Sequence, residues 1–425
     1  MKKIVPILLL ACVSLLAQRY PSHPVGQYWS FPDARSLSLA GAGSVSLSAP
    51  GALLSNPAAL TQIKGPLSFD LTFSSWKLEE RRSYPLYDRF DSYLVNSTYA
   101  LNNNWYSRPQ GSAAVKLPFF GIPSLTLAAG IFSEIDYRYN YLEEVRENIF
   151  GDPIIAYNQI EANGVLQRYS TAVAMSIPGI PKLAVGLQAG ILSGSNDRQT
   201  EVNYLTTGER VVLESENRKL TNTPLVFSFG SIYPFSERIS AGFDLSLPYT
   251  LKYEVIQSEN EILQESIGYP LRLNAGFEYR ARQELQARLN VDIGYEFWSN
   301  QESTRKTVEE QSLLLEFSDV FYFKTGVEHI FFNNIPFGVG AQYRNSYQRR
   351  GITQTLLAAG SGFLGQNWRI DLAGAISKLS YRWKDLFDDK MYVDDPNFQS
   401  RRDLDTVDET YFFLQLSFKY FIDFR

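Results

Sequence analysis

Apolar residues occupy every second position in the last stretch of the chain, from Phe412 to Phe424. The positions between them include Gln415, Ser417, Lys419 and Asp423. A period of two places one face of a β-strand in an apolar medium and the other face in a polar one. Because the same alternation recurs along most of the chain, the sequence predicts an all-β fold whose strands each have one apolar face.

Strand length and spacing make this prediction more specific. From Leu67 onward we predict about fourteen strands, which are longer than most soluble strands and long enough to cross a bilayer at a tilt. They are Leu67–Leu78, Gly111–Phe120, Ser124–Asp136, Leu166–Ile177, Lys182–Ser193, Thr223–Pro234, Arg238–Lys252, Gly268–Arg282, Leu285–Ser299, Asp319–Phe332, Ile335–Tyr347, Ile352–Phe363, Asn367–Arg382 and Thr410–Phe424. Short turns alternate with long polar stretches, as in outer-membrane barrels. The sequence therefore predicts a transmembrane antiparallel β-barrel spanning 67–425, with long extracellular loops.

The predicted loops are the long polar stretches between strands. They are Glu79–Gln110, Tyr137–Val165, Gly194–Asn222, Tyr253–Ile267, Asn300–Ser318 and Trp383–Glu409. An even number of strands leaves both ends of the barrel domain on the side of the short turns, which faces the periplasm in this class of protein.

Composition agrees with a barrel in a bacterial outer membrane. The 28 Phe, 26 Tyr and 6 Trp residues suit aromatic girdles at the two membrane interfaces. A mean hydropathy of −0.19 is compatible with this, because polar lumen residues alternate with lipid-facing ones. The net charge of −5 provides no basic surface for nucleic acid.

The N-terminus is typical of a secretory signal, which we assign to residues 1–17. Lys2 and Lys3 precede a short apolar run, and Ala17 is a plausible last residue before cleavage. An alternative is a lipoprotein cleavage box that ends at Cys12, the single cysteine of the chain. Cleavage after Ala17 would leave a mature protein without thiol or disulfide chemistry.

Residues 18–66 form a region rich in Ser, Ala, Gly and Pro that does not have strand periodicity. It contains Gly41, Gly43 and the tripeptide Asn56, Pro57 and Ala58, in which the asparagine can cap a short helix that begins at the proline. Its leucines and valines give it apolar surface to bury. We therefore interpret it as a folded N-terminal plug, the alternative being a flexible linker.

Three features of the sequence occur together: the Gly-Ala-Gly stretch, the Asn-Pro-Ala tripeptide before the first strand and the fourteen-strand plan. In this combination the sequence resembles the FadL-type outer-membrane proteins. That family includes long-chain fatty acid and aromatic hydrocarbon channels and PorV-like barrels of type IX secretion. The resemblance implies passive uptake: a hydrophobic molecule binds near the external loops, passes to a pocket above the plug, and leaves sideways through a gap in the wall. It also implies contact with outer-membrane lipid and with the barrel-assembly machinery.

Two other functions stay open at this point. A PorV-like barrel would bind secreted protein in secretion or surface attachment, and a structural barrel would carry nothing. Residue chemistry does not favour an enzyme, because the sequence lacks a phosphate-binding loop, a zinc-type spacing and a cysteine pair. No cofactor is expected. His329, the one histidine of the predicted barrel, shares a strand face with apolar residues and is interpreted as structural.

Charged residues on the polar strand faces are expected to point into the lumen, where they would steer a substrate or form ion pairs. They include Asp70, Lys116, Glu134, Arg168, Arg288, Asp292, Arg344, Arg369, Asp371 and Lys419. A gap in the wall needs small residues, and Gly130 in the third predicted strand is a candidate. The acidic stretch Asp385–Asp395 is interpreted as a solvated loop, with a divalent-cation site as the alternative.

Overall fold

The computed structural model describes residues 25–28, 31–117, 124–147, 152–180, 182–257, 261–281, 286–306, 311–331, 333–348, 351–392 and 404–422. The predicted signal segment 1–17, including Cys12, lies outside these residues, as do part of the acidic stretch after Tyr392 and the end of the last predicted strand. No helix within the described ranges is long and apolar enough to cross a membrane.

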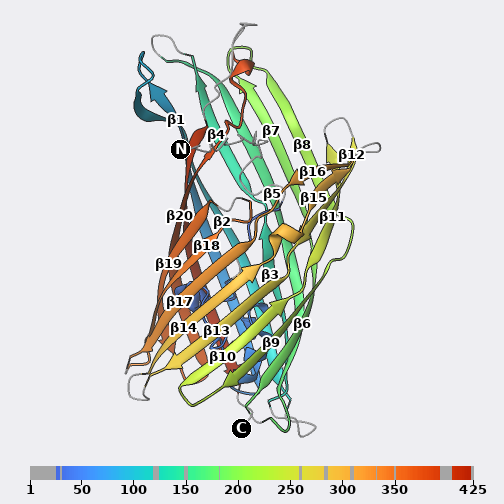
Figure 1. Cartoon of the computed structure of the whole chain (residues 1–425), viewed down its shortest axis with the longest axis vertical. Helices are drawn as coiled ribbons and strands as arrows, with labels where there is room; N and C mark the ends of the chain where they lie inside the picture. The colour runs from blue at the N-terminus through green and yellow to red at the C-terminus, as the bar shows by residue number, and fades with distance from the viewer. Residues whose placement is uncertain are drawn as a thin grey trace, which may run out of the picture.

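Fourteen antiparallel strands close into a ring, because the first strand pairs with the last as well as with the second (Figure 1). The ring strands are β1 Leu67–Tyr87, β2 Tyr93–Lys116, β3 Thr126–Asp136, β5 Ile154–Ser176, β6 Ala184–Ser193, β9 Leu225–Pro234, β10 Ile239–Ser246, β13 Arg272–Arg280, β14 Ala287–Glu296, β17 Val320–Ile330, β18 Pro336–Asn345, β19 Thr353–Leu364, β20 Trp368–Trp383 and β21 Asp405–Ile422. Each overlaps one predicted strand. The predicted closed β-barrel is therefore confirmed.

Alternation along the strands separates the two surfaces of the wall. In β21, Leu414, Leu416 and Phe418 are exposed on the outside, whereas Ser417 and Lys419 are buried inside. The same holds for most of the ring, which produces an apolar belt around the lower part of the barrel. This belt has the character of the lipid-facing band of outer-membrane barrels.

Seven further strands extend the wall at one end, in stretches for which the sequence predicts loops. They are β4 Tyr139–Arg146, β7 Ser195–Tyr204, β8 Arg210–Leu220, β11 Tyr249–Gln257, β12 Ile262–Tyr269, β15 Ser303–Lys306 and β16 Gln311–Leu315. The loop prediction is wrong for these strands, apart from the start of β11 and the end of β12, which fall in predicted strands, and it is also wrong for most of 79–110, which continues β1 and β2. The reason is an inverted pattern, since in β4 Tyr139 and Tyr141 are buried inside while Asn140 and Glu144 are exposed.

The N-terminal part of the chain forms short helical turns inside the barrel, shown in blue in Figure 1. They are α1 Ala34–Ser38, η1 Pro50–Leu54 and η2 Pro57–Gln62; two further 3-10 turns, η4 Trp298–Asn300 and η5 Asp389–Met391, lie in the extension. Residues 31–63, called the inner segment below, are almost entirely buried against the inward faces of the ring strands.

Candidate functional site

The Asn-Pro-Ala tripeptide fastens one end of the inner segment to the wall. The Asn56 side chain accepts a hydrogen bond from the backbone N–H of Ala58 at 3.1 Å and so caps η2, which begins at Pro57. Its amide nitrogen donates to the carbonyl oxygen of Ser231 in β9 at 3.2 Å. One side chain therefore starts the helical turn and ties it to the barrel.

Glycines on the inward strand faces make room for the inner segment. Gly186 of β6 and Gly230 of β9 are cross-strand neighbours, and a Cβ atom at either position would collide with Asn56 or Pro57. A second cross-strand pair, Gly326 of β17 and Gly340 of β18, lies against Leu39 in the same way. The backbone of the inner segment thus rests directly on the backbone of the wall at two separate places.

The predicted motif residues Gly41 and Gly43 form a bend that binds a wall carboxylate. Both have positive φ angles, 77° and 107°, which favour glycine. The N–H groups of Gly43 and Ser44 each donate to Asp292 Oδ2 at 3.1 Å, and the Ser44 hydroxyl donates to Asp292 Oδ1 at 3.1 Å. Asp292 is therefore an anchor for the inner segment.

Ion pairs join α1 and its N-cap residue Asp33 to strands β17 and β21 of the wall. The Arg35 guanidinium lies 2.7 Å from Glu328 Oε2 of β17, and Lys419 Nζ of β21 lies 2.5 Å from Asp33 Oδ2. Glu328 also contacts Arg369 at 3.1 Å, and Asp371 is shared by Arg369 at 2.7 Å and Lys419 at 3.6 Å. All of these side chains are largely shielded from solvent, so the charges depend on one another.

The two charged groups of the inner segment are stabilised in their ionised forms. Burial by itself raises the pKa of Asp33, but the Lys419 ammonium, the Ser36 N–H and the Arg35 charge together offset this and hold the pKa below its ordinary value. Burial lowers the pKa of Arg35, but the Glu328 carboxylate, together with Asp33 and Asp371, outweighs it and raises the pKa. The docked position of the segment therefore favours the ionised form of both groups.

The remaining predicted lumen charges are spread along the wall. Asp70 is buried and accepts a hydrogen bond from Thr72 at 3.0 Å, Arg288 lies 3.5 Å from Glu278, and Lys116 is half-buried at the end of β2. Arg344 lies 3.4 Å from Glu296. Both Arg344 and Asp292 line a polar cavity of about 120 Å³ beside the inner segment.

Sequence reasoning missed Asp33, Arg35 and Glu328. Glu328 could have been predicted to point inward, because it alternates with the outward residues of its strand. Asp33 and Arg35 lie in a region without periodicity. His329 faces outward, with its ring 4.6 Å from that of Phe331. Within the described ranges, no three His, Cys, Asp or Glu side chains are grouped as a metal site.

Above the inner segment, aromatic side chains line the lumen of the extension in two clusters. The first includes Trp76, Tyr106, Tyr139, Tyr141 and Tyr411, and the second includes Tyr137, Tyr249, Tyr253, Tyr269 and Trp298. Residues 25–28 run between them. Tyr269 donates to the carbonyl of Val25 at 2.6 Å, and the Gln27 amide donates to the Tyr411 hydroxyl at 2.7 Å. A cavity of about 80 Å³ remains beside these residues.

The wall contains a seam between β2 and the strands that follow it. β2 pairs with β3 over only six residue pairs, from Lys116 and Thr126 to Gly111 and Ile131. Beyond Gly111, the rest of β2 pairs with β1 alone among the described strands, while β3 and β4 pair with β5. Two strand edges therefore face each other without a backbone ladder.

Side chains bridge this seam instead. The bonds run from Asn104 Nδ2 to Asn140 O at 2.6 Å, from Leu142 N to Asn102 Oδ1 at 2.8 Å, from Asn140 N to the Tyr106 hydroxyl at 3.0 Å and from Arg138 Nη1 to Ser107 O at 3.0 Å. Tyr106, Tyr139 and Tyr141 of the first aromatic cluster lie at the inner side of the seam. Its lower end is flanked on the outside by exposed Phe73 and Ile131 of the apolar belt.

Gly130, the residue predicted to mark a wall opening, is paired on both sides, with Ser112 of β2 and Ser170 of β5. The pairing with β2 ends one residue later, at Ile131. A register shift in β3 between Ser133 and Ile135 follows directly. The structure thus places Gly130 in the last paired rows below the seam.

Comparison with known proteins identifies the fold. No family model matches the sequence, and neither does any curated protein. Among solved structures, a Pseudomonas aeruginosa FadL homologue matches with a TM-score of 0.64 and 14% identity, over 94% of this chain and 100% of that one. The P. putida toluene transporter TodX matches with a TM-score of 0.60 and 12% identity, over 92% of this chain and 99% of that one.

The Ralstonia pickettii toluene transporter TbuX matches with a TM-score of 0.60 and 15% identity, over 92% of this chain and 98% of that one. At these identities the matches show the architecture. The chain has the closed fourteen-strand barrel of the FadL-type outer-membrane channels, as the sequence motifs predict.

Proposed function

We propose that this chain is an outer-membrane channel for passive uptake of hydrophobic small molecules, with residues 18–66 as its plug. The observation that carries the proposal is the seam between β2 and β4, which has aromatic side chains of the lumen on its inner side and the edge of the apolar belt at its lower end. An apolar molecule that enters from outside meets aromatic side chains above the inner segment. The inner segment, anchored by Asp292, Glu328 and Lys419, blocks the way straight down.

The seam provides a way out that leaves the backbone ladders intact. The side-chain bridges across it involve Asn102, Asn104 and Tyr106, and these can part without breaking a strand pairing. Because its lower end reaches the belt, a molecule that passes through it enters the membrane without meeting water. Substrates are then selected by apolar character and size, and no chemical step is needed.

The proposal is tested by locking the seam. Cysteines in place of Asn104 and Asn140, joined by a short bismaleimide in protein reconstituted into vesicles, should stop uptake of radiolabelled oleate and toluene. The matched control joins cysteines in place of Ser75 and Ser107, which already face each other in the β1–β2 ladder with their hydroxyls 3.1 Å apart. Uptake by the cross-linked seam variant at the rate of the cross-linked control would contradict lateral exit.

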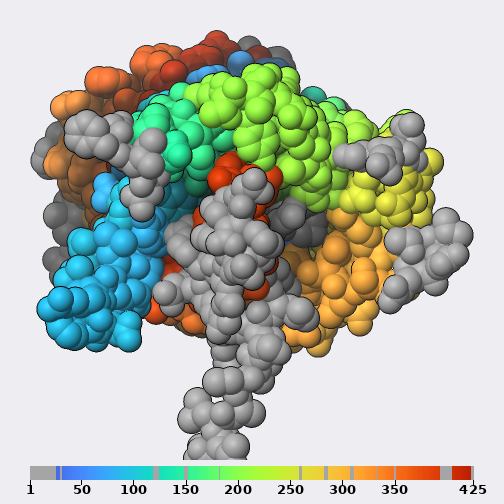
Figure 2. Space-filling model, turned by 90° about the horizontal axis from the view of Figure 1, so that it is seen from above, coloured from blue at the N-terminus to red at the C-terminus, as the bar shows by residue number. Residues whose placement is uncertain are grey.

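A secretion-associated role is the second candidate, and one feature favours it. The end of the β1–β2 hairpin, light blue in Figure 2, stands away from the rim when viewed from above and exposes Leu86, Tyr87, Phe90, Tyr93 and Leu94. An apolar tip of this kind suits contact with another protein. Native mass spectrometry distinguishes the two roles, because a retained apolar small molecule supports uptake and a retained polypeptide supports cargo binding.

A further inference from the structure

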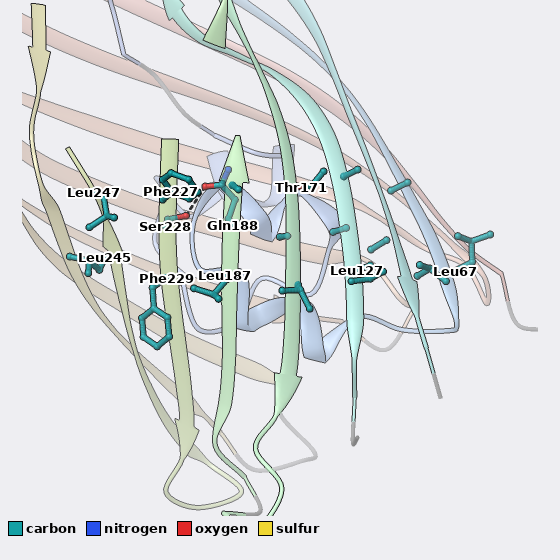
Figure 3. Close-up of a pocket in the computed structure, with 18 residues that line it drawn as sticks. Leu67, Leu127, Thr171, Leu187, Gln188, Phe227, Ser228, Phe229, Leu245 and Leu247 are labelled. Carbon is teal, nitrogen blue, oxygen red and sulfur yellow. Dashed lines mark hydrogen bonds between the residues drawn. The ribbon is translucent and has the colours of Figure 1, made fainter. Parts of the chain in front are cut away.

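A large groove lies on the outer face of the barrel, across β2, β3, β5, β6 and β9 (Figure 3). Its volume is about 760 Å³, within the range of roughly 300 to 1,000 Å³ that ligand sites occupy. Figure 3 shows its side chains on adjacent strands, with the helical turns of the inner segment behind the sheet. The groove is thus outside the lumen and separate from the proposed uptake path.

The groove follows from a row of small side chains in cross-strand register. Ala113 pairs with Ala129, Ala129 with Thr171, and Thr171 with Ala189. All four stand on the outer face, and with strands spaced about 4.8 Å apart the row spans about 14 Å. Thr171 supplies the one hydroxyl of the row.

Larger apolar side chains border this row. One strand position away on the same face, about 7 Å along each strand, lie Leu127, Val173 and Leu187, all exposed. On the side of the seam, the corresponding row consists of Ile131, Tyr169 and Ile191, also exposed. The small residues are therefore a low stretch of the outer face between two rows of larger side chains, and the groove runs from this trough past Leu127 and Leu187 toward Phe229.

The floor is held rigid from the inside. The inward neighbours Ala114, Ala128 and Ala172 belong to one buried hydrophobic cluster with Ala58 and Leu60 of the inner segment. Ser228 and Gln188 lie beside the groove with their side chains turned to the inner face, where they are hydrogen-bonded to each other at 2.8 Å. A trough with a firm floor exists before anything binds, which lowers the cost of ordering a guest.

We propose that this groove binds one acyl chain of an outer-membrane lipid in a fixed position. The groove is continuous with the apolar belt, so hydrocarbon is what it meets in a bilayer. No charged side chain lines it, which does not suit a head group. Because a lipid tail gains no hydrophobic energy by moving from bilayer to groove, its retention depends on shape and dispersion contacts. The trough supplies these.

The test uses the full barrel in phosphatidylcholine vesicles doped with phosphatidylcholine that carries a diazirine in one acyl chain. After irradiation, mass spectrometry of peptides should find labelling concentrated on Thr126–Ile131 and Ala184–Ile191 above the level of the rest of the belt. Ala129→Phe and Ala189→Phe, made separately, should each bring labelling of these peptides down to that level. The matched control, Ala341→Phe, changes an outward-facing alanine of β18 and should leave it unchanged.

Uniform labelling of the belt in the unaltered protein would overturn the proposal, and this result does not depend on whether a variant folds. Labelling at the groove that persists in both filled variants would overturn it as well. A heat-dependent shift in electrophoretic mobility establishes that each variant has formed a barrel. Uptake measurements are not needed, so the result is independent of the proposed channel function.

Discussion

A small number of buried charges hold the inner segment in place. Asp33 and Arg35 each face an opposite charge of the wall, and both sit where a lone charge would be strongly disfavoured. Since these contacts connect residues hundreds of positions apart in the chain, they form only in the closed barrel. The docking of the segment is therefore sensitive to single substitutions and to pH.

Replacing Asp33 by Asn should loosen the inner segment at neutral pH. Removing one partner of a buried pair costs about 3–5 kcal/mol, and Asp371 at 3.6 Å from Lys419 keeps the effect toward the lower value. Because the pKa of Asp33 is lowered in the folded protein, its carboxylate stabilises the docked segment above pH 3.8, the ordinary pKa. This stabilisation is lost as the pH falls below 3.8. Leak conductance in planar bilayers should therefore rise for D33N at pH 7, and for the unaltered protein only in acid.

The control for this measurement is Asp152→Asn, at an exposed carboxylate outside the barrel lumen. If D33N leaks no more than D152N at pH 7, the ion pair does not hold the segment. Proteolysis of the segment from the lumen side gives a second readout, because a released segment is cleaved.

A titrating carboxyl in the extension gives an opposite dependence on pH. Burial, followed by the charge of Asp385, raises the pKa of Glu143 in β4 from 4.5 to about 7. Because the buried site accepts the protonated carboxyl, the free energy of unfolding has its full value below pH 4.5. It falls as the pH rises through about 7 and the carboxyl ionises. Glu143→Gln should thus raise the midpoint of thermal unfolding at pH 8 and have little effect at pH 5.

The matched variant is Glu144→Gln, on the adjacent exposed carboxylate. We expect it to leave the midpoint unchanged at both pH values. Equal effects of E143Q and E144Q at pH 8 would mean that surface charge, and not burial of Glu143, accounts for the change.

At the scale of elements, the close contact between wall and inner segment requires inward glycines. Gly186→Val would place a side chain where Pro57 and Ala58 lie, and overpacking of this kind costs about 1–3 kcal/mol. We expect the barrel to form, with the inner segment displaced and leak conductance raised. Gly374→Val is the control, because a Cβ there meets only Phe413 O at 3.5 Å, an ordinary contact. A leak of similar size in both variants would indicate a general weakening of the wall.

The alternation of residues was sufficient to predict the ring but not its extension. In the belt the outside is apolar, so a run such as Leu414, Leu416 and Phe418 is easily recognised. Above the belt the outside meets water and the inside is largely aromatic. The residues still alternate with a period of two, but the apolar ones point inward and differ less in polarity from their neighbours. In β7 even the inward residues Asn196, Arg198 and Thr200 are polar, so this strand resembles a polar loop.

The candidate site was predictable only in part, for a different reason. The sequence indicates which side chains point inward, and it points to Asn56 and Gly43 by their local chemistry. It does not indicate which distant partner each one meets, because Arg35 and Glu328 are joined by a fold that closes over almost 300 positions. The seam is a missing pairing, and no local residue pattern distinguishes the unpaired part of β2 from the paired part.

For the whole molecule, the apolar belt determines where the barrel sits relative to a bilayer. Leu289 and Ile293 of β14 face outward within the belt, whereas Thr250 of β11 faces outward above it. An arginine at mid-membrane costs about 2–4 kcal/mol, and the cost falls to about 0–1 kcal/mol near the interface. Leu289→Arg and Ile293→Arg should therefore reduce the fraction of protein that assembles into vesicles, and Thr250→Arg should not.

Heat-dependent electrophoretic mobility after refolding into vesicles measures that fraction directly. The three variants introduce the same side chain on the same surface of the wall, at positions that differ in height along the barrel. Normal assembly of both belt variants would mean that the belt does not contact lipid, and the lateral path through the seam would then end in water. Loss of assembly confined to L289R and I293R supports a bilayer that covers the lower wall, with the lower end of the seam at its upper edge.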